Sequence, residues 1–480
     1  MAKFRISAVK PGTKESTIYW YDNMSSLVFD ETGKIIELNG LPQRYAPFPV
    51  QTSIDTPAGK SHKIKVLKIQ LGLSCNYECS YCNQRFVPHA DETRKDDVTP
   101  FLQTLPTWLE TDGSDLRVEF WGGEPLVYWK TLQPLAEGIR SLYPKAQFSM
   151  VTNGSILDKE KNQWLDEMNF SIGLSHDGPG YHVRGLDPFD NPEQFEMIMD
   201  LWSRLGPKHR MSFNAMIHKD NPSRAAVSKW FKERLGFDVP IGEGAFIDPY
   251  DEGGEAVCMT DLGNHLRFRN DAFSEIRRGE ASNFGIIERK INGFIRSIVT
   301  KKPASALGQK CGMDNPENIA VDLKGNVLTC QNVSAAATSF NGESHLIGNV
   351  SDLDNVKLKT STHWSHREGC PNCPVLQLCQ GSCMFLTGDM FKLACNNAYS
   401  DNIPYFMAAW EILFGTIPYY IDGPQPEERR DIVGEINGIP EPKQVKKIIP
   451  IQPITDRSEE HTTELQSHLN LVCRLLLEKK

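Results

Sequence analysis

The sequence predicts an α/β protein, a partial TIM-like (β/α)6 barrel that is followed by a cysteine-rich C-terminal domain. From residue 63 to about residue 250, short apolar runs alternate with segments of helical periodicity, which is typical of repeated βα units around a parallel sheet. From residue 311 onward, cysteine, glycine and proline dominate instead. The chain has 480 residues, which corresponds to about three folding units at roughly 150 residues each.

The first segment, residues 1–62, reads as a short β-rich lead-in. Its alternating stretches run from Thr17 to Tyr21 and from Ser26 to Phe29. The sequence Asp-Glu-Thr-Gly that starts at Asp30 predicts a hairpin turn directly after them.

Six apolar runs between residues 63 and 250 are the expected strands of the barrel. They cover residues 64–71, 116–121, 147–152, 170–175, 211–217 and 237–245. Six βα units are too few for a closed barrel of eight strands, so we expect the barrel to stay open.

Helical periodicity fills the gaps between these runs. The expected helices cover residues 129–142, 158–168, 192–205 and 222–235. Asp158 and Asn221 stand where N-caps belong, and Pro222 follows Asn221 at the first helical position.

The remaining chain divides by composition. Residues 251–310 form a helical connector, because residues 259–302 read as helix, and residues 311–417 form the cysteine-rich domain with a closing helix at about 402–414. Seven prolines between residues 418 and 456 predict an extended C-terminal segment.

Residues 457–480 resemble a translated sequencing adapter. We therefore interpret them as a non-native tail, assign no function to Cys473, and exclude the tail from the fold. The alternative is an amphipathic helix, since Leu465, Leu469, Val472 and Leu476 are helically spaced.

Charge and hydropathy exclude several classes of partner. The chain carries 52 Lys and Arg against 61 Asp and Glu, a net charge of −9, and has no basic block, so we expect neither nucleic acid nor membrane as partner. It shows no signal peptide and no long apolar run, which predicts a cytoplasmic protein. Thiols stay reduced in that compartment, so its clustered cysteines are expected to bind metal.

The first cysteine cluster consists of Cys75, Cys79 and Cys82, and begins four residues after the first predicted strand ends. Three thiolates hold three irons of a [4Fe-4S] cluster and leave the fourth iron without a protein ligand. A structural zinc site would need four ligands, and a ferredoxin a run of four cysteines, so both alternatives fit less well.

This Cys-x3-Cys-x2-Cys loop after a first strand resembles the hallmark of the radical S-adenosylmethionine (SAM) superfamily. The resemblance implies that SAM chelates the open iron, and that its reductive cleavage yields a 5'-deoxyadenosyl radical which abstracts a substrate hydrogen. Tyr81 matches the family position beside the adenine, although a generic loop aromatic is the alternative.

A second match follows the second predicted strand, where Gly122, Gly123, Glu124 and Pro125 stand in sequence. Glycines let a backbone approach a ligand closely, and a carboxylate accepts bonds from an ammonium group. The segment is similar to the family's motif for the SAM amino group, with Glu124 as acceptor. Alone, the same four residues read as a turn.

Weaker matches stand after later strands. Ser175, within Ser-His-Asp-Gly, and Arg184 are similar to a serine and an arginine that contact SAM in relatives, and Thr152-Asn-Gly ends the third strand. The alternative for each is a polar turn.

Seven more cysteines lie between residues 311 and 395. They are Cys311, Cys330, Cys370, Cys373, Cys379, Cys383 and Cys395. Seven ligands suit two cubane clusters with one ligand missing better than tetrahedral zinc sites. Their spacing, with Gly325 and the segment Ile347-Gly-Asn, resembles the SPASM domain of radical SAM peptide and protein maturases.

That resemblance implies two auxiliary [4Fe-4S] clusters. Cys311, Cys330 and Cys383 would bind the first, and the other four cysteines the second. The first cluster then lacks a fourth cysteine ligand. Cys258, a non-cysteine ligand or a substrate thiolate would fill that position. The alternative for Cys258 is an inert buried thiol.

The leading hypothesis is therefore a radical SAM maturase that crosslinks or oxidises a residue in a peptide or protein. Its expected partners are a ribosomal precursor peptide and an external reductant, flavodoxin or ferredoxin.

An anaerobic sulfatase maturase is the alternative. Such enzymes carry an acidic base directly after the cysteine that matches Cys330, but this chain has Gln331 there, which is a poor proton acceptor. Oxidation of a small molecule and a non-catalytic iron-sulfur carrier stay open. The general base and any leader-peptide site are not located.

Overall fold

The computed structural model describes residues 3–38, 57, 59–90, 92–358 and 362–433. Its centre is a nine-stranded sheet in the order β12-β11-β10-β4-β5-β6-β7-β8-β9. Six of its strands follow one another in sequence and pair in parallel: β4 Val66–Gln70, β5 Arg117–Trp121, β6 Gln147–Thr152, β7 Phe170–Ser175, β8 Met211–Asn214 and β9 Ile241–Glu243. The sheet has two free ends, so the expected α/β fold with an open, partial (β/α)6 barrel is confirmed.

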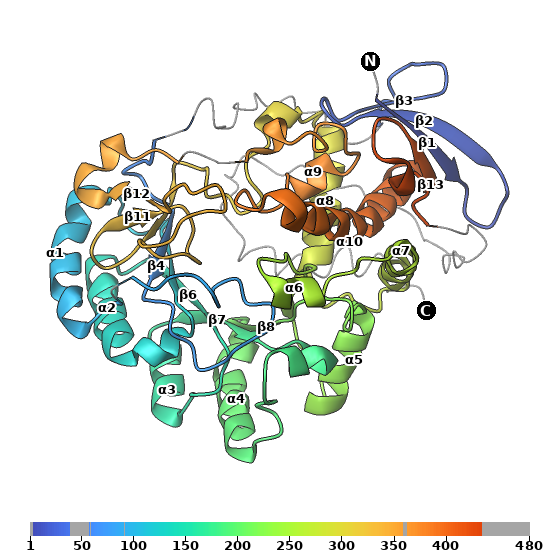
Figure 1. The fold of residues 1–480 in the computed structure, drawn as a ribbon. Helices are drawn as coiled ribbons and strands as arrows, with labels where there is room; N and C mark the ends of the chain where they lie inside the picture. Colours follow the sequence, from blue (N-terminus) through green and yellow to red (C-terminus); the bar gives the residue numbers. More distant parts are fainter. Residues whose placement is uncertain (1–2, 39–56, 58, 91, 359–361, 434–480) are drawn as a thin grey trace.

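Helices between these strands cover one face of the sheet, along the left and lower rim in Figure 1. They are α1 Val98–Trp108, α2 Trp129–Leu142, α3 Lys159–Glu167, α4 Pro192–Leu205 and α5 Arg224–Leu235. Strand side chains alternate accordingly: Val118 and Phe120 of β5 are buried in the core, whereas Arg117, Glu119 and Trp121 between them are half-buried. The second face of the strands is therefore left with a polar lining.

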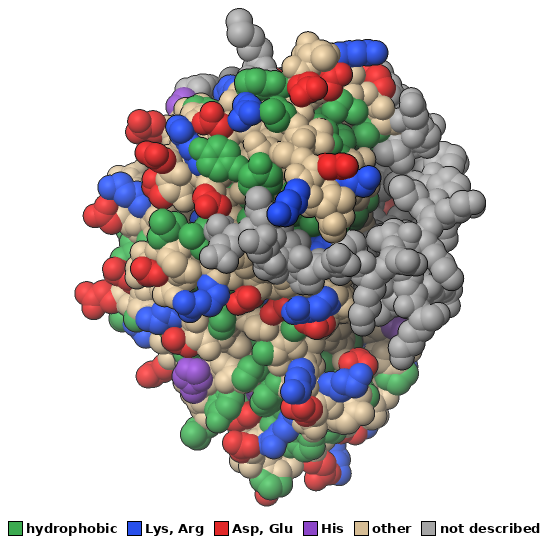
Figure 2. All heavy atoms as spheres, turned by 90° about the vertical axis from the view of Figure 1, so that its right-hand side faces the viewer, with side chains coloured by type: hydrophobic (Ala, Val, Ile, Leu, Met, Phe, Trp, Pro, Cys, Tyr) green, Lys and Arg blue, Asp and Glu red, His purple; other side chains and the backbone are tan. Residues whose placement is uncertain are grey.

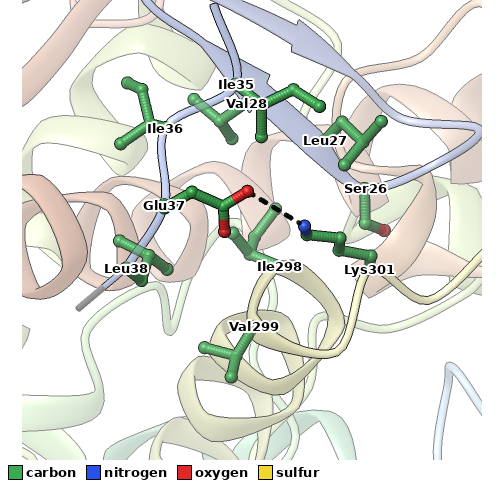
Figure 3. Close-up of a pocket in the computed structure, with 10 residues that line it drawn as sticks. All are labelled: Ser26, Leu27, Val28, Ile35, Ile36, Glu37, Leu38, Ile298, Val299 and Lys301. Carbon is green, nitrogen blue, oxygen red and sulfur yellow. Dashed lines mark hydrogen bonds and ion pairs between the residues drawn. The ribbon is translucent and has the colours of Figure 1, made fainter. Parts of the chain in front are cut away.

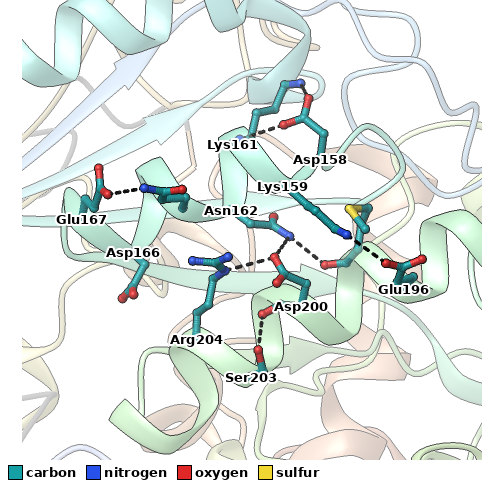
Figure 4. Close-up of polar contacts among 12 residues, drawn as sticks. Asp158, Lys159, Lys161, Asn162, Asp166, Glu167, Glu196, Asp200, Ser203 and Arg204 are labelled. Carbon is teal, nitrogen blue, oxygen red and sulfur yellow. Dashed lines mark hydrogen bonds and ion pairs between the residues drawn. The ribbon is translucent and has the colours of Figure 1, made fainter.

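Neighbouring helices of this layer are also linked by polar contacts (Figure 4). On α3, Asn162 donates to Asp200 Oδ2 of α4 at 2.9 Å, and Arg204 donates to the same oxygen at 3.0 Å. Lys159 and Glu196 form an ion pair at 3.3 Å. These contacts hold α3 and α4 side by side.

The predicted helix starts are right in one case and wrong in the other. The Asp158 side chain accepts from Lys161 N and caps α3 as expected. Asn221 does not cap α5, because the Ser223 side chain accepts from Ala226 N instead. The Asn221 amide donates to the Asp177 carbonyl, a tertiary contact that the local pattern does not reveal.

Other boundaries also shift. β8 and β9 are shorter than the apolar runs that predicted them, and the expected helix over residues 259–302 is two helices, α7 Leu262–Arg278 and α8 Gly285–Val299. Gly279 separates them in a left-handed conformation, φ 68°, that glycine adopts without strain. A short helix, α6 Glu252–Ala256, precedes them.

The closing helix is longer than expected. α10 runs over Gly388–Phe414 and packs against α7 and α8. It therefore includes Cys395, which the sequence analysis placed in an irregular region before a helix at 402–414. A short α9, Leu376–Cys379, lies near its start.

The N-terminal strands form a second sheet with the order β13-β1-β2-β3. It contains β1 Phe4–Val9, β2 Ser16–Asp22, β3 Leu27–Phe29 and β13 Ile417–Asp422. The chain from residue 418, predicted to be an extended C-terminal segment, thus begins as a strand, and its position at the edge of the sheet tolerates Pro418. The turn at Asp30 is as expected, since Gly33 N donates to Asp30 O at 3.0 Å.

The cysteine-rich region continues the barrel sheet. It contributes β10 Asn318–Val321, which pairs in parallel with β4, and then the antiparallel β11 Asn326–Leu328 and β12 Leu346–Asn349. Buried Lys60 donates to Met313 O at 2.6 Å and to Asn318 O at 2.7 Å. One sheet thus joins this region to β4, the strand that precedes the first cysteine cluster.

Short 3-10 helices complete the described chain: η1 Lys95–Asp97, η2 Pro125–Tyr128, η3 Gly178–Val183, η4 Gly206–Lys208, η5 Ala304–Ala306, η6 Val350–Asn355, η7 Trp364–His366 and η8 Glu427–Arg429. Of the helices in the described part of the chain, none has the length and apolarity to cross a membrane. On the face shown in Figure 2, positive and negative side chains are interspersed. The predictions for residues 457–480, including Cys473, lie outside the described residues.

Candidate active site

The first cysteine cluster lies on the loop after β4. Burial raises the pKa of Cys79 to about 11, and the neighbouring Cys82 and Cys75 act in the same direction. Cys82 also raises the pKa of Cys75. The three thiols therefore lie close to one another, at the carboxyl end of the first barrel strand.

The two predicted glycines bring the loop after β5 against this cysteine loop. Gly123 N donates to Gly72 O at 3.1 Å, and a Cβ on Gly123 would lie 2.4 Å from the carbonyl oxygens of Leu73 and Ser74. Gly122 is also close, since its Cβ would lie 3.2 Å from Gly72 O. The close approach that we expected toward a ligand is made here toward the backbone that precedes Cys75.

The Glu124 side chain joins the loops that follow β5 and β6. Its Oε1 accepts from Leu126 N at 3.0 Å and from Thr152 Oγ1 at 2.7 Å, and its Oε2 accepts from Asn153 N at 2.7 Å. The side chain is buried, and burial raises its pKa. A carboxylate oxygen accepts more than one bond, so Oε2 retains capacity for a further donor. Pro125 follows as the first residue of η2, a position where its missing N–H is not needed.

Tyr81, Asp177 and Arg184 form a connected group. The Tyr81 hydroxyl donates to Asp177 Oδ2 at 2.6 Å and accepts from Arg184 Nη1 at 2.9 Å. The backbone adds a bond from Ser80 N to Val183 O at 2.8 Å. Two predicted SAM contacts, Tyr81 and Arg184, are thus held together across the loops after β4 and β7.

Asp177 was not assigned a role from the sequence, although the quoted Ser-His-Asp-Gly segment contains it. It is fully buried, and its Oδ1 also accepts from Met216 N after β8 at 2.9 Å. Ser175, the predicted SAM contact in the same segment, is the half-buried last residue of β7. It lies at the same edge of the sheet as Glu124 and the cysteine loop.

The second set of cysteines separates into two groups. Cys370, Cys373, Cys379 and Cys395 line one pocket together with Tyr399 and Arg429. Burial raises the pKa of Cys373 to about 12, with Arg429 opposing and Cys395 and Cys379 adding to the shift. These are the four cysteines that the SPASM resemblance implies as ligands of one auxiliary cluster.

Cys311, Cys330 and Cys383 form the other group. Burial raises the pKa of Cys330 to about 12, and Cys311 and Cys383 add to the shift. The Tyr250 hydroxyl is hydrogen-bonded to Cys383. The sequence analysis did not connect Tyr250 with this group, because Tyr250 precedes Cys383 by 133 residues.

None of the eleven described cysteines forms a disulfide. Within the described ranges, no three Cys, His, Asp or Glu side chains converge on a position for a single metal ion. In a [4Fe-4S] cluster each thiolate binds a different iron, so its ligands do not converge on one ion. Three groups of free, neighbouring thiols have the donor chemistry that such clusters require.

Cys258 packs in the main hydrophobic core beside Val257 and Met259. Burial raises its pKa to about 12, with contributions from Asp248 and Glu255. This environment is that of a buried structural thiol.

Gln331 lies beside Cys330 on the polar side of the barrel sheet. Lys68 Nζ of β4 lies 3.5 Å from Gln331 Oε1 and 3.4 Å from Glu119 Oε2 of β5. Burial opposes ionisation of Glu119, but Lys68 and Arg117 lower its pKa, so Glu119 is a carboxylate. The sequence analysis missed this carboxylate because Glu119 lies within a predicted strand, far from the cysteines in sequence.

A separate pocket lies between the N-terminal sheet and α8 (Figure 3). Val28, Ile36 and Ile298 line it, and Glu37 and Lys301 form an ion pair at 3.4 Å across it. None of the predicted site residues lines this pocket, so it is distinct from the cysteine groups.

Comparison with known proteins finds no matching family model. By sequence, the chain is 19% identical to the radical SAM cyclopropyl synthase TigE of Paramaledivibacter caminithermalis. The alignment spans 376 residues and covers 71% of each chain. It is 24% identical over 345 residues to a cysteine-type anaerobic sulfatase-maturating enzyme of Clostridium perfringens, covering 64% of this chain and 85% of the relative.

These relatives are radical SAM enzymes. Radical SAM enzymes use SAM and a [4Fe-4S] cluster, so the relatives agree with the cofactors expected from the first cysteine cluster.

Among solved structures, the chain is similar to native anSMEcpe with bound AdoMet and Cp18Cys peptide (TM-score 0.48, 20% identity, 72% of this chain and 98% of that one). It is also similar to Streptococcus suis SuiB bound to its precursor peptide SuiA (TM-score 0.42, 16% identity, 67% and 72%).

Proposed function

We propose that this protein is a radical SAM enzyme that abstracts a hydrogen from a residue of a peptide or protein. The observation that carries the proposal is the meeting of four strand-end loops at one edge of the parallel sheet. This edge brings the three cysteines after β4 together with Glu124 after β5, Asn153 after β6 and the Asp177–Arg184 group after β7. Such edges of α/β barrels carry their chemistry.

The residues present fit the cofactors. Cys75, Cys79 and Cys82 would hold a [4Fe-4S] cluster with one open iron, and Glu124 Oε2 would accept a bond from the SAM ammonium group. Bound there, the reduced cluster and SAM would supply a 5'-deoxyadenosyl radical. Tyr81 and Arg184 hold the loop around the third cysteine in place.

A peptide or protein substrate is supported by the sulfatase-maturating relatives, whose name states a protein as the substrate. The two further cysteine groups support a SPASM domain with two auxiliary [4Fe-4S] clusters, as expected for a maturase. We propose a ribosomal precursor peptide as the substrate, a crosslink or an oxidised side chain as the product, and flavodoxin or ferredoxin as the electron donor. We also propose a cytoplasmic location, where the cysteines assigned to clusters would stay reduced.

A sulfatase maturase is the second candidate, because two relatives of that activity are 24% identical. Gln331 argues against it. The neutral amide cannot serve as base at that position, and the nearby carboxylate, Glu119, is engaged by Lys68 and Arg117.

Anaerobic reconstitution with iron and sulfide, followed by SAM and dithionite, tests the enzyme class. We expect 5'-deoxyadenosine from the wild type and none from the variant Cys75→Ala, Cys79→Ala, Cys82→Ala, which should also lose about one cluster's iron. Cys258→Ala is the matched control, since this thiol lies in the apolar core, and it should retain both iron and activity.

The same assay identifies the substrate class. Peptides encoded beside the gene, synthesised with deuterium at each candidate residue, should transfer deuterium to 5'-deoxyadenosine and change mass. A sulfatase-derived peptide that acquires a formylglycine aldehyde would favour the second candidate instead. A protein that holds all its clusters and forms no 5'-deoxyadenosine would be an iron-sulfur carrier, and the proposal would be wrong.

A further inference from the structure

We propose that Arg429 sets the reduction potential of the second auxiliary cluster, the one assigned to Cys370, Cys373, Cys379 and Cys395, by donating a hydrogen bond to a ligand sulfur. The inference rests on the proposed function, because it takes these four cysteines as cluster ligands. Arg429 comes from η8, in the proline-rich segment that the sequence analysis predicted to be extended.

The geometry of the guanidinium carries the inference. Arg429 Nη2 lies 3.3 Å from Cys395 Sγ and donates to it, and the same nitrogen donates to Asn396 Oδ1 at 2.6 Å. The guanidinium carbon lies 4.9 Å from the centre of the Tyr399 ring, and the Tyr399 hydroxyl donates to the Arg429 carbonyl at 2.6 Å. Contacts on three sides thus hold the charge against the cysteine pocket.

The surroundings make this charge effective. Arg429 is one of the residues that line the pocket, and Val375 and Leu376 give the same wall an apolar surface. Cys370 is 7% exposed. Charges act over longer distances in such an apolar environment than in water.

Three other cations near the pocket make their hydrogen bonds and ion pairs to groups other than a cysteine sulfur. Arg367 donates to the carbonyl of Cys383 and to Thr362 Oγ1. Lys290 donates its ammonium to the Leu378 carbonyl, and Lys310 pairs with Asp248 at 3.3 Å. Arg429 differs from all three because its hydrogen bond reaches a cysteine sulfur.

The expected effect follows from charge. Reduction adds one negative charge to a cluster that already carries four thiolates, so a fixed guanidinium stabilises the reduced form more than the oxidised form. Hydrogen bonds to ligand sulfurs and net charge both set the potentials of such clusters. Loss of Arg429 should therefore lower the potential.

The test is a redox titration followed by electron paramagnetic resonance, on the full-length chain with Cys75, Cys79 and Cys82 replaced by alanine to remove the first cluster's signal. The signal that is lost on a further Cys395→Ala substitution identifies the second auxiliary cluster. We expect Arg429→Ala to reduce the ratio of reduced to oxidised cluster about tenfold at a fixed potential, a shift of about 59 mV for one electron.

Two further variants separate charge from structure. Arg430→Ala is the matched control, since Arg430 pairs with Asp422 at 3.3 Å and should leave the potential unchanged. Arg429→Lys retains the charge, so the potential of its cluster should lie close to that of the wild type. If Arg429→Ala does not load the cluster, Arg429→Gln, which keeps a donor without the charge, replaces it in the comparison.

The outcomes distinguish the two proposals. A wild type whose four cysteines hold no iron contradicts the proposed function. A loaded cluster whose potential is the same in wild type and Arg429→Ala, or shifts equally in Arg430→Ala, contradicts the role of Arg429 alone.

Discussion

Tyr81 and Asp177 share a hydrogen bond of 2.6 Å, although 96 residues separate them. Tyr81 lies between two cysteines of the loop after β4, and Asp177 follows β7. The bond therefore ties the cysteine loop to the opposite part of the barrel edge, where Asp177 also accepts from Met216 N.

Tyr81→Phe should weaken SAM binding. The change removes the donor to a buried carboxylate, which costs about 1–3 kcal/mol, and it leaves Arg184 without its hydroxyl acceptor. We expect the dissociation constant for SAM, measured by equilibrium dialysis on the reconstituted protein, to rise about tenfold. Tyr77→Phe is the control, because the Tyr77 hydroxyl makes a 3.4 Å bond in an exposed position, and it should bind SAM as the wild type does. Equal affinities for wild type and Tyr81→Phe would contradict the prediction.

Glu124→Gln should damage both stability and activity. The carboxylate accepts three hydrogen bonds, and an amide nitrogen in the place of one oxygen would face a backbone or hydroxyl donor. We expect the free energy of unfolding to fall by about 1–3 kcal/mol and 5'-deoxyadenosine formation to fall at least tenfold. Glu160→Gln, at an exposed position on α3, controls for the lost charge. A Glu124→Gln variant with unchanged rate and unfolding midpoint would be inconsistent with this role.

His265 should make stability depend on pH. Burial lowers the pKa of His265 to about 4, and Arg269 and Arg429 act in the same direction. The unfolded chain takes up the proton near pH 6.5 and the folded chain only near pH 4, so stability should fall as pH falls through this window, by about 3 kcal/mol in total.

Urea unfolding of wild type and His265→Gln at pH 7.5 and at pH 5 measures this effect. The variant should lose less stability between the two values than the wild type, whereas His182→Gln, at an exposed position, should behave like the wild type. Parallel losses in wild type and His265→Gln would show that other groups cause the dependence.

Arg224→Met should be strongly destabilising. Arg224 of α5 is 2% exposed, pairs with Asp401 of α10, and donates to the Gly244 carbonyl after β9 at 2.9 and 2.7 Å. Removing one partner leaves the Asp401 carboxylate buried without its cation, which costs about 3–5 kcal/mol. Denaturant unfolding should show this loss. The control is Arg234→Met, since Arg234 also lies on α5 but forms a more exposed pair with Asp190; this change should cost about 0–1 kcal/mol. A cost below that of the control would refute the prediction.

Some features of the fold follow from local sequence. The strands at 147–152 and 170–175, and the helices at 129–142 and 192–205, have the predicted bounds, because each is an uninterrupted periodic segment with clear ends. Asp158 caps α3 for the same local reason. Where local patterns compete with tertiary contacts the prediction fails, as at Asn221, whose amide serves the Asp177 carbonyl.

The sequence by itself determined the cysteine spacing, the order of βα units and the identity of Gln331. These are properties of neighbouring residues and of periodicity, which need no knowledge of the whole fold. They were sufficient to predict an open α/β barrel with iron-sulfur clusters, and the resemblance to the radical SAM superfamily added the expectation of SAM.

Only the tertiary structure decided which distant residues meet. It placed Asp177 against Tyr81, Lys68 between Glu119 and Gln331, and Arg429 against Cys395. It also turned the segment after Phe414 into a strand that pairs with β1, which brings Arg429 to the cysteines. Such contacts depend on burial of side chains from several elements at once, and that burial exists only in the folded chain.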